Sequence, residues 1–276
     1  MVNDNSHREV KHNGNGSRSL LEREIRVLEL GSLRRIDPII SVAEAKRLIR
    51  KASVDPELAN VFTKIFTRVN ELSKENTDLR SKLLTDELTG LGNERRYVED
   101  SHKLLLNYKR EFEQYINNKK RNKKARAPRT ISFAVLDGNG LKDINDTLGH
   151  HFGDIAIKRL GKSISNTVRT SDYVYRKGKG ADEFILILNC DKQSTQGILS
   201  RIKDELLEIN QEENKKLLKE NKISFNVAFA SGVSNISDIK TVHILEKTPE
   251  ELAKRLFDLA EINMYNIKKD MKRNGK

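Results

Sequence analysis

The chain has 276 residues, of which 36% are hydrophobic and 33% charged, and it carries a formal net charge of +12. This length accommodates one sizeable α/β domain and a smaller element. The single cysteine excludes a disulfide framework, and no apolar run approaches the ~20 residues of a membrane span. Because the N-terminus also lacks the apolar core of a signal peptide, we expect a soluble, cytoplasmic protein.

Two regions precede the main domain. Residues 1–18 are rich in Asn, Ser, Gly and His and are predicted to form a disordered tail. Residues 19–54 hold two short segments of helical spacing with a break at Asp37-Pro38, which predicts a short helical region of unknown role. We expect an upstream regulator to act on this region, although its residues do not identify the signal.

A heptad pattern follows over residues 55–84. Asp55-Pro56 is typical of a helix start, and the apolar residues after it alternate at spacings of four and three. This pattern favours a parallel two-stranded coiled coil, and therefore a homodimer joined through residues 58–83. An amphipathic helix packed on its own domain is the alternative. The a positions are Phe62, Val69, Asn76 and Leu83, and the d positions are Leu58, Ile65, Leu72 and Leu79.

From residue 85 onward, predicted strands and helices alternate. One helix followed by a paired hairpin predicts an α+β fold with a central mixed, mostly antiparallel sheet flanked by helices. The predicted helices cover 93–117, 154–168, 193–219 and 249–272, and the predicted strands cover 131–136, 173–177, 183–189 and 225–231.

Much of the positive charge lies in residues 119–129, which contain no acidic residue. Such a run could contact RNA, DNA or anionic lipid. No aromatic residue is interleaved with these charges, so the sequence offers no platform for stacking bases. We therefore expect a solvated loop between a helix and the first strand, and nucleic acid is an unlikely partner.

Two segments place carboxylates beside predicted strand ends. Asp137 opens the stretch DGNGLKDINDTLGHHFGD directly after strand 131–136, and the stretch 180–184, GADEF, opens strand 183–189. Two carboxylates at neighbouring strand ends suit a magnesium–nucleotide site, and nearby glycines let a ligand approach the backbone. Either segment alone is equally compatible with a turn that carries solvated acids.

Four patches, in this order, resemble the GGDEF domain of diguanylate cyclases. Residues 86–96 resemble the opening DxLTGLxNRR, and residues 137–154 resemble DxDxFKxINDxxGHxxGD. Residues 180–184 resemble the signature that names the family, and residues 265–268 resemble the YxAK of its last helix. The resemblance implies that residues 85–276 form a GGDEF domain with a nucleotidyl-cyclase-like fold.

The resemblance also implies an activity. Two GTP molecules would be condensed into cyclic di-GMP and two pyrophosphates, at a site formed across a homodimer with Mg²⁺ or Mn²⁺. Asp137, Asp182 and the backbone carbonyl of Gly138 would bind the metal. Asp182, Glu183 and Lys268 would form the catalytic set. Because side chains alternate along a strand, Glu183 is expected to face the side opposite Asp182.

Further residues would bind the substrate. A carboxylate at Asp154 can accept hydrogen bonds from the N1–H and N2 amine of guanine, a pair of donors that adenine lacks. Capping of a helix that begins at Ile155 is the alternative role of Asp154. Lysine at 272 also suits the dipole of a helix end without any ligand. The implied substrate-binding residues are Leu141, Lys142, Asn145, Asp154 and Lys272.

Arg169 and Asp172 resemble the RxxD site at which product binds and inhibits the enzyme. An exposed ion pair of little energetic value is the alternative.

The chain departs from the family pattern in two places. Ala181 replaces the second glycine of the signature, and a Cβ there is expected to crowd a nucleotide or strain the turn. The segment from Lys177 to Ala181 is two residues longer than usual. These departures favour a catalytically degenerate domain that binds GTP or cyclic di-GMP and signals to a partner. The intact metal-binding and base-reading residues favour the enzyme.

Overall fold

The structure is a computed structural model that describes residues 47, 56–121, 123–178 and 181–273, without the side chains of Asn221 and Lys272. The predicted tail over 1–18 lies outside the described residues, and so does the predicted helical region over 19–54 apart from Arg47. The chain divides into two compact units, Met1–Arg80 and Ser81–Lys276. Across the described residues, no helix combines the length and apolar content that crossing a membrane requires.

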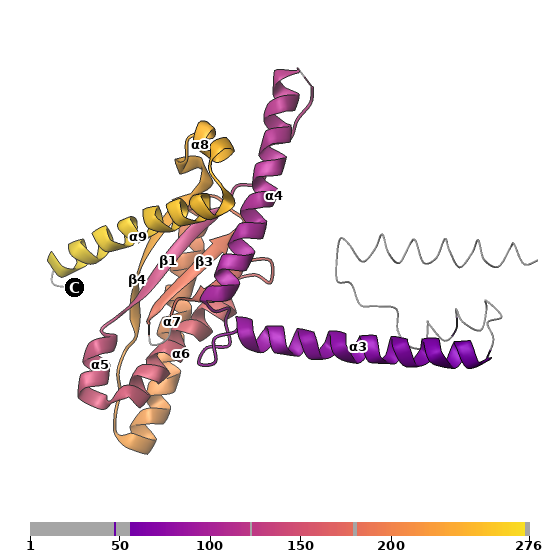
Figure 1. Cartoon of the computed structure of the whole chain (residues 1–276). Coiled ribbons are helices and arrows are strands. Elements are labelled where there is room, and N and C mark those ends of the chain that lie inside the picture. The colour runs from indigo at the N-terminus through magenta and orange to yellow at the C-terminus, as the bar shows by residue number, and fades with distance from the viewer. Residues whose placement is uncertain (1–46, 48–55, 122, 179–180, 274–276) are drawn as a thin grey trace, which may run out of the picture. The chain divides into compact units, whose positions relative to one another are not determined.

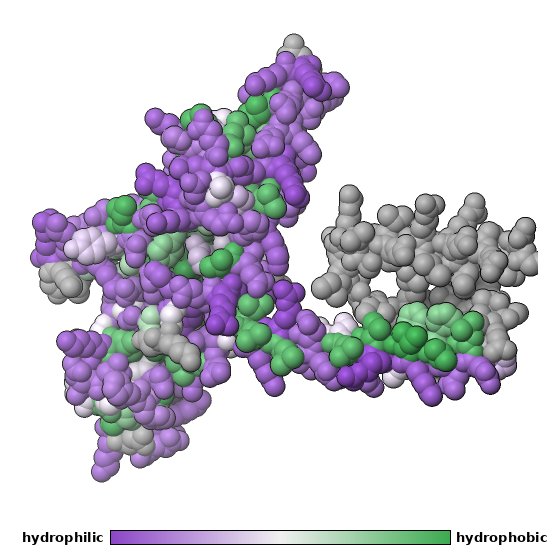
Figure 2. Space-filling view, in the orientation of Figure 1, coloured by the Kyte–Doolittle hydropathy of each residue, from purple (hydrophilic) through white to green (hydrophobic). Residues whose placement is uncertain are grey.

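Helix α3 spans Pro56–Leu84 and buries none of its residues. Its first turn carries Glu57 and its last turn Lys82, a distribution of charge that favours a helix. Figure 2 shows hydrophobic residues running along the helix. The predicted a and d side chains are 36–60% exposed, and pairing of this face with a second copy stays a prediction. These exposed residues are Leu58, Phe62, Ile65, Val69, Leu72, Leu79 and Leu83.

The predicted α+β fold is confirmed. Strands β1 (Ser132–Asn139), β2 (Tyr173–Arg176), β3 (Glu183–Leu188) and β4 (Ala228–Asn235) form a sheet in the order β2-β3-β1-β4. Neighbouring strands of this sheet run antiparallel. An isolated parallel bridge joins Gly92 to Tyr175 of β2.

Two strands have different bounds from those predicted. Strand β1 continues through Gly138 and Asn139 because both residues pair with β4. Strand β4 starts three residues later than predicted, because the side chain of Asn210 binds both backbone polar groups of Val227 and so replaces a strand partner there. Asp137 therefore lies within β1 and not beyond its end.

The helices of the main domain are α4 (Glu94–Lys120), α5 (Leu141–Leu148), α6 (His150–Thr167), α7 (Lys192–Asn221), α8 (Thr241–Glu246) and α9 (Pro249–Arg273). A short 3₁₀ turn covers Ile236–Asp238. The prediction of a helix starting at 154 was wrong. Gly149, at φ 94°, separates α5 from α6, and a conformation with positive φ ends a helix without steric cost only at glycine.

The sheet has a different set of helices on each face (Figure 1). Leu136 and Phe184 pack with α6 and α7 in one hydrophobic cluster. Phe133 and Ile185 pack with α4 and α9 in another. Because side chains alternate along a strand, Asp137 and Glu183 extend the rows that face α4 and α9.

Candidate functional site

The edge of the β1–β3 pair brings four of the predicted site residues together. Asp137 and Glu183 are register partners across the two strands. Next to them, the amide of Gly138 donates a hydrogen bond to the carbonyl of Asp182 at 3.0 Å. A Cβ at position 138 would lie 3.1 Å from the Cβ of Asp182, which is tighter than an ordinary contact. Glycine at 138 therefore lets the two strand ends approach.

The carboxylates at this edge repel one another. Burial raises the pKa of Asp182, and the negative charge of Asp137 raises it further. Burial likewise raises the pKa of Glu183, to which Glu261 and Asp137 add. Crowded, partly buried carboxylates stabilise a cation placed among them. The site therefore favours cation binding.

Two lysines neutralise part of this charge. The ammonium of Lys268, from α9, lies 2.5 Å from a carboxylate oxygen of Asp137. The ammonium of Lys177, from the hairpin that joins β2 and β3, lies 3.1 Å from Glu183. No lysine or arginine of the described chain lies within ion-pair distance of Asp182. Asp137 and Glu183 therefore each have a lysine partner, and Asp182 has none among the described residues.

The residues at this edge suit a divalent metal ion. Carboxylate and carbonyl oxygens are hard donors of the kind that Mg²⁺ prefers, and a few protein ligands suffice when substrate phosphates supply the rest. The ammonium of Lys268 already occupies a cation position beside Asp137. In the described part of the chain, no three His, Cys, Asp or Glu side chains are arranged to hold a metal. The ligands that the family resemblance implies, Asp137, Asp182 and the carbonyl of Gly138, would leave the remaining positions to substrate oxygens and water.

A buried arginine joins the signature loop to the turn that follows α3. Arg176 is 4% exposed, and its guanidinium donates to both oxygens of Asp86 and to the carbonyl of Ala181. Asp86 also accepts from the amide and hydroxyl of Thr89. Neither Arg176 nor Asp86 was predicted from sequence to belong to the site. The position of Asp86 within the motif at 86–96 was the available signal.

The expected crowding or strain at Ala181 stays a prediction, because its φ angle depends on residue 180, which lies outside the described part. The carbonyl of Ala181 accepts a hydrogen bond from Arg176. The longer hairpin begins with an additional pairing, in which the amide of Lys177 donates to the carbonyl of Glu183. Gly178 then adopts φ 74°, which glycine tolerates. Residues 179 and 180 lie outside the described part.

The predicted guanine-binding residues lie on α5 and α6. A Cβ at the buried Gly153 would lie 1.9 Å from the side-chain oxygen of Asn145, so glycine leaves the space that Asn145 occupies next to Asp154. Asp154 is exposed. It does not cap its helix, because α6 begins at His150 with Gly149 as the N-cap residue.

The remaining predicted substrate residues differ in their surroundings. Leu141 packs against the hydrophobic cluster on the α6 and α7 face of the sheet, and Lys142 is exposed one residue further along α5. The side chain of Lys272 lies outside the described part.

Arg169 and Asp172 form a tight turn before β2. The carboxylate of Asp172 accepts from the backbone amide of Arg169 at 3.1 Å, and the amide of Asp172 donates to the carbonyl of Arg169. No ion pair joins the two side chains within the described residues, so the exposed ion pair considered above is absent. The side chain of Asn189 donates to the carbonyl of Ser171 and attaches this turn to the end of β3.

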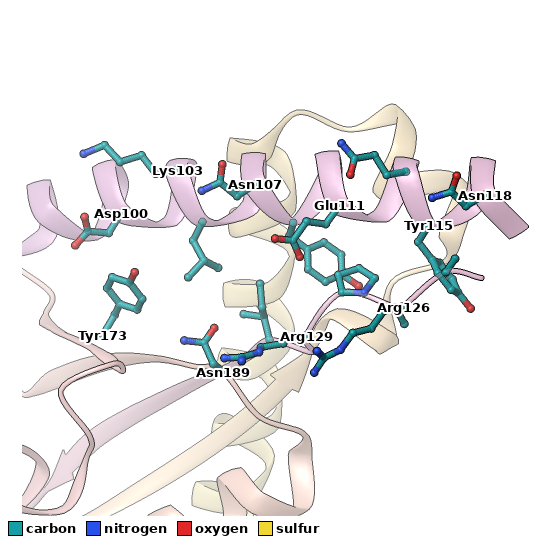
Figure 3. Close-up of a pocket in the computed structure, with 17 residues that line it drawn as sticks. Asp100, Lys103, Asn107, Glu111, Tyr115, Asn118, Arg126, Arg129, Tyr173 and Asn189 are labelled. Atoms are coloured by element: carbon teal, nitrogen blue, oxygen red, sulfur yellow. The ribbon is translucent and has the colours of Figure 1, made fainter. Parts of the chain in front are cut away.

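A groove of about 630 Å³ lies between α4 and residues 125–131. Figure 3 shows Arg126 and Arg129 below α4, with Tyr115 and Tyr173 toward opposite ends of the groove. The fold thus brings tyrosines beside the basic segment, which the linear sequence did not reveal. Within the described chain, neither Arg126 nor Arg129 has a carboxylate at ion-pair distance.

The sequence of this chain is similar to a known protein family and to curated proteins. The sequence model of the family described as "Diguanylate cyclase, GGDEF domain" matches residues 83–274. The chain is 29% identical over 194 residues to the probable diguanylate cyclase DgcJ of Escherichia coli (strain K12), a match that covers 70% of this chain and 32% of that protein. It is 33% identical over 135 residues to the diguanylate cyclase DosC of the same strain, covering 48% of this chain and 24% of that protein.

These matches span a third or less of each curated relative. Among solved structures, the coiled coil and GGDEF domain of DgcB from Caulobacter crescentus, in complex with c-di-GMP, aligns with a TM-score of 0.50. That alignment covers 79% of this chain and 96% of the other at 21% identity, which supports the fold alone.

Proposed function

This chain belongs to the GGDEF domain family of diguanylate cyclases, and we propose that it condenses two GTP molecules into cyclic di-GMP and two pyrophosphates. The observation that carries this proposal is the cluster of Asp137, Gly138, Asp182 and Glu183 at one sheet edge, with Lys268 beside it. Crowded carboxylates next to an ammonium group are suited to a metal ion and a polyphosphate.

In this proposal Asp137, Asp182 and the carbonyl of Gly138 hold Mg²⁺ or Mn²⁺. When bound, such an ion polarises the α-phosphate and lowers the pKa of the attacking ribose 3′-hydroxyl. Lys268 leaves Asp137 and binds a phosphate oxygen of the substrate, and the exposed Lys142 adds a second positive charge. Lys272 is proposed for the same role from its place in α9.

Guanine recognition is assigned to Asn145 and Asp154. The fit of Asn145 against Gly153 brings its amide next to the helical turn that carries Asp154. The carboxylate of Asp154 accepts from guanine N1–H and N2, while the amide of Asn145 bonds another edge of the base. Because adenine lacks these two donors, GTP is favoured over ATP.

The reaction requires two GTP molecules, each of which attacks the α-phosphate of the other. One protomer with one site cannot present both, so we assign the complete site to a homodimer. The exposed apolar seam of α3 supports this assignment, because the apolar residues at its a and d positions are 36–60% exposed. The N-terminal region would pass an upstream signal to this coil.

Product binding is proposed at Arg169 and Asp172. The groove beside Tyr173 offers two further arginines without carboxylate partners in the described chain, which suits a ligand with two phosphates and two bases. Replacing Arg169 by alanine should raise the concentration of cyclic di-GMP that half-inhibits the enzyme by about tenfold or more. An unchanged value would remove Arg169 from the site.

The proposed function is tested by incubating the purified chain with GTP and Mg²⁺ and detecting cyclic di-GMP by liquid chromatography. Product should form with GTP and not with ATP. A degenerate binding module, which is the alternative, would bind cyclic di-GMP without forming it. The presence of both proposed metal carboxylates, Asp137 and Asp182, at one sheet edge favours the enzyme.

A further inference from the structure

We propose that Lys177 is a positioning residue that holds the carboxylate of Glu183 away from the divalent ion, so that Lys177 and the ion compete for Glu183. The proposal rests on the metal site assigned under the proposed function, and it concerns a side chain that the family resemblance gave no role. Lys177 lies in the hairpin that is two residues longer than the family pattern.

The first support is the geometry of the pair. Lys177 and Glu183 lie opposite one another where the β2–β3 ladder ends, with the amide of Lys177 donating to the carbonyl of Glu183 at 2.9 Å. Their side chains meet at 3.1 Å and are 32% and 16% exposed. A pair that is partly shielded from water and anchored on adjacent strands loses less side-chain entropy than a flexible surface pair.

The second support is the ring of Phe257, from α9. The ammonium of Lys177 lies 4.1 Å from the centroid of this ring, within the range of a cation–π interaction. The ring is itself held by a tilted contact with Tyr97 at 6.4 Å. Lys177 is therefore fixed between an aromatic face and a carboxylate, and it fixes Glu183 in turn.

The third support is the unequal partnering of the carboxylates. Lys268 pairs with Asp137 and Lys177 with Glu183, while Asp182 has no cation at ion-pair distance in the described chain. Lys177 also lines a cavity of about 230 Å³ together with Tyr97 and Phe257.

The test is direct Mn²⁺ binding, measured by calorimetry on the full chain without nucleotide and therefore without turnover. Lys177→Met should tighten Mn²⁺ binding about fivefold, because it releases the carboxylate of Glu183 to a nearby divalent ion. Lys177→Arg should keep the wild-type affinity, since it preserves the pair with Glu183. Lys203→Met is the matched control, because Lys203 also lies over a phenylalanine ring, that of Phe229, but pairs with no described carboxylate.

Repeating the measurement in a Glu183→Gln background separates positioning from a general charge effect. If Lys177 acts through Glu183, Lys177→Met should change the affinity of that background by less than twofold. A fivefold change in both backgrounds, an unchanged or weaker affinity in Lys177→Met alone, or no Mn²⁺ binding by any variant would each overturn the proposal. If the chain forms no cyclic di-GMP but the binding pattern holds, the proposed function fails and the inference about Lys177 stands.

Discussion

Replacing Arg176 by methionine tests the buried contact between the turn after α3 and the signature loop. The guanidinium of Arg176 is 4% exposed and donates to both oxygens of Asp86 and to the carbonyl of Ala181. Removing one member of a buried ion pair generally costs about 3–5 kcal/mol, because the other charge stays buried. Asp86 keeps its hydrogen bonds from Thr89, so we expect a loss of about 3 kcal/mol in the free energy of unfolding.

Urea unfolding followed by circular dichroism measures this loss. Lys162→Met is the matched control, because Lys162 pairs with Glu213 at 4.0 Å but is 54% exposed. An exposed pair contributes about 0–1 kcal/mol, so the control should stay close to wild type. A loss below about 1 kcal/mol in Arg176→Met, or equal losses in both variants, would refute the assignment of a buried, stabilising ion pair.

The same contact gives the stability a pH dependence. Burial alone would raise the pKa of Asp86, but the hydrogen bonds from Thr89 and the charge of Arg176 bring it below its ordinary value of 3.8. A carboxyl with a lowered folded-state pKa stabilises the fold above its unfolded pKa, and this contribution disappears as the pH falls through the folded value. Wild type should therefore lose stability below about pH 4 more steeply than Asp86→Asn. Parallel curves of unfolding free energy against pH for wild type and Asp86→Asn would contradict this reasoning.

Two further predictions concern substrate binding and dimerisation. Gly153→Ala should weaken GTP binding about tenfold, because its Cβ would displace the side chain of Asn145. Gly197→Ala in α7 is the control, because a Cβ there meets open space. It should leave GTP affinity unchanged and stabilise the helix by up to about 1 kcal/mol. The affinities are measured by calorimetry with a non-hydrolysable GTP analogue. Equal affinities of Gly153→Ala and wild type would show that Asn145 does not contact the guanine base. Leu72→Asp in the seam of α3 should halve the mass measured by light scattering and reduce turnover, whereas Lys74→Ala outside the seam should do neither. Wild-type turnover by a monomeric Leu72→Asp variant would contradict the proposal that the enzyme dimerises through α3.

The strongly patterned parts of this fold could be predicted from sequence. The apolar runs of β1 and β3 predicted buried strands, and both strands are largely buried. That Asp182 and Glu183 face opposite sides stays a prediction, because Asp182 precedes the first residue of β3. Local hydrophobic patterns suffice for such elements because side-chain direction repeats every two residues in a strand.

The contacts that position the site depend on packing between distant segments. Arg176 lies 90 residues after Asp86, and Lys177 meets a ring on α9 that no local pattern connects with the hairpin. Helix α5 and the first turn of α6 were missed, because the predicted helix of this region began only at residue 154. Similarly, the tyrosines near Arg126 and Arg129 come from α4 and β2, so their proximity to the basic segment appears only in the fold.

The most direct test of the account is the initial rate of cyclic di-GMP formation by wild type and Asp182→Ala, with GTP and saturating Mg²⁺. Asp204→Ala, at an exposed aspartate of α7, is the matched control. We expect wild type and the control to form product at equal rates, and Asp182→Ala to be at least about 100-fold slower, because it loses a proposed metal ligand. Product formation at the wild-type rate by Asp182→Ala, or no product from wild type, would contradict the account.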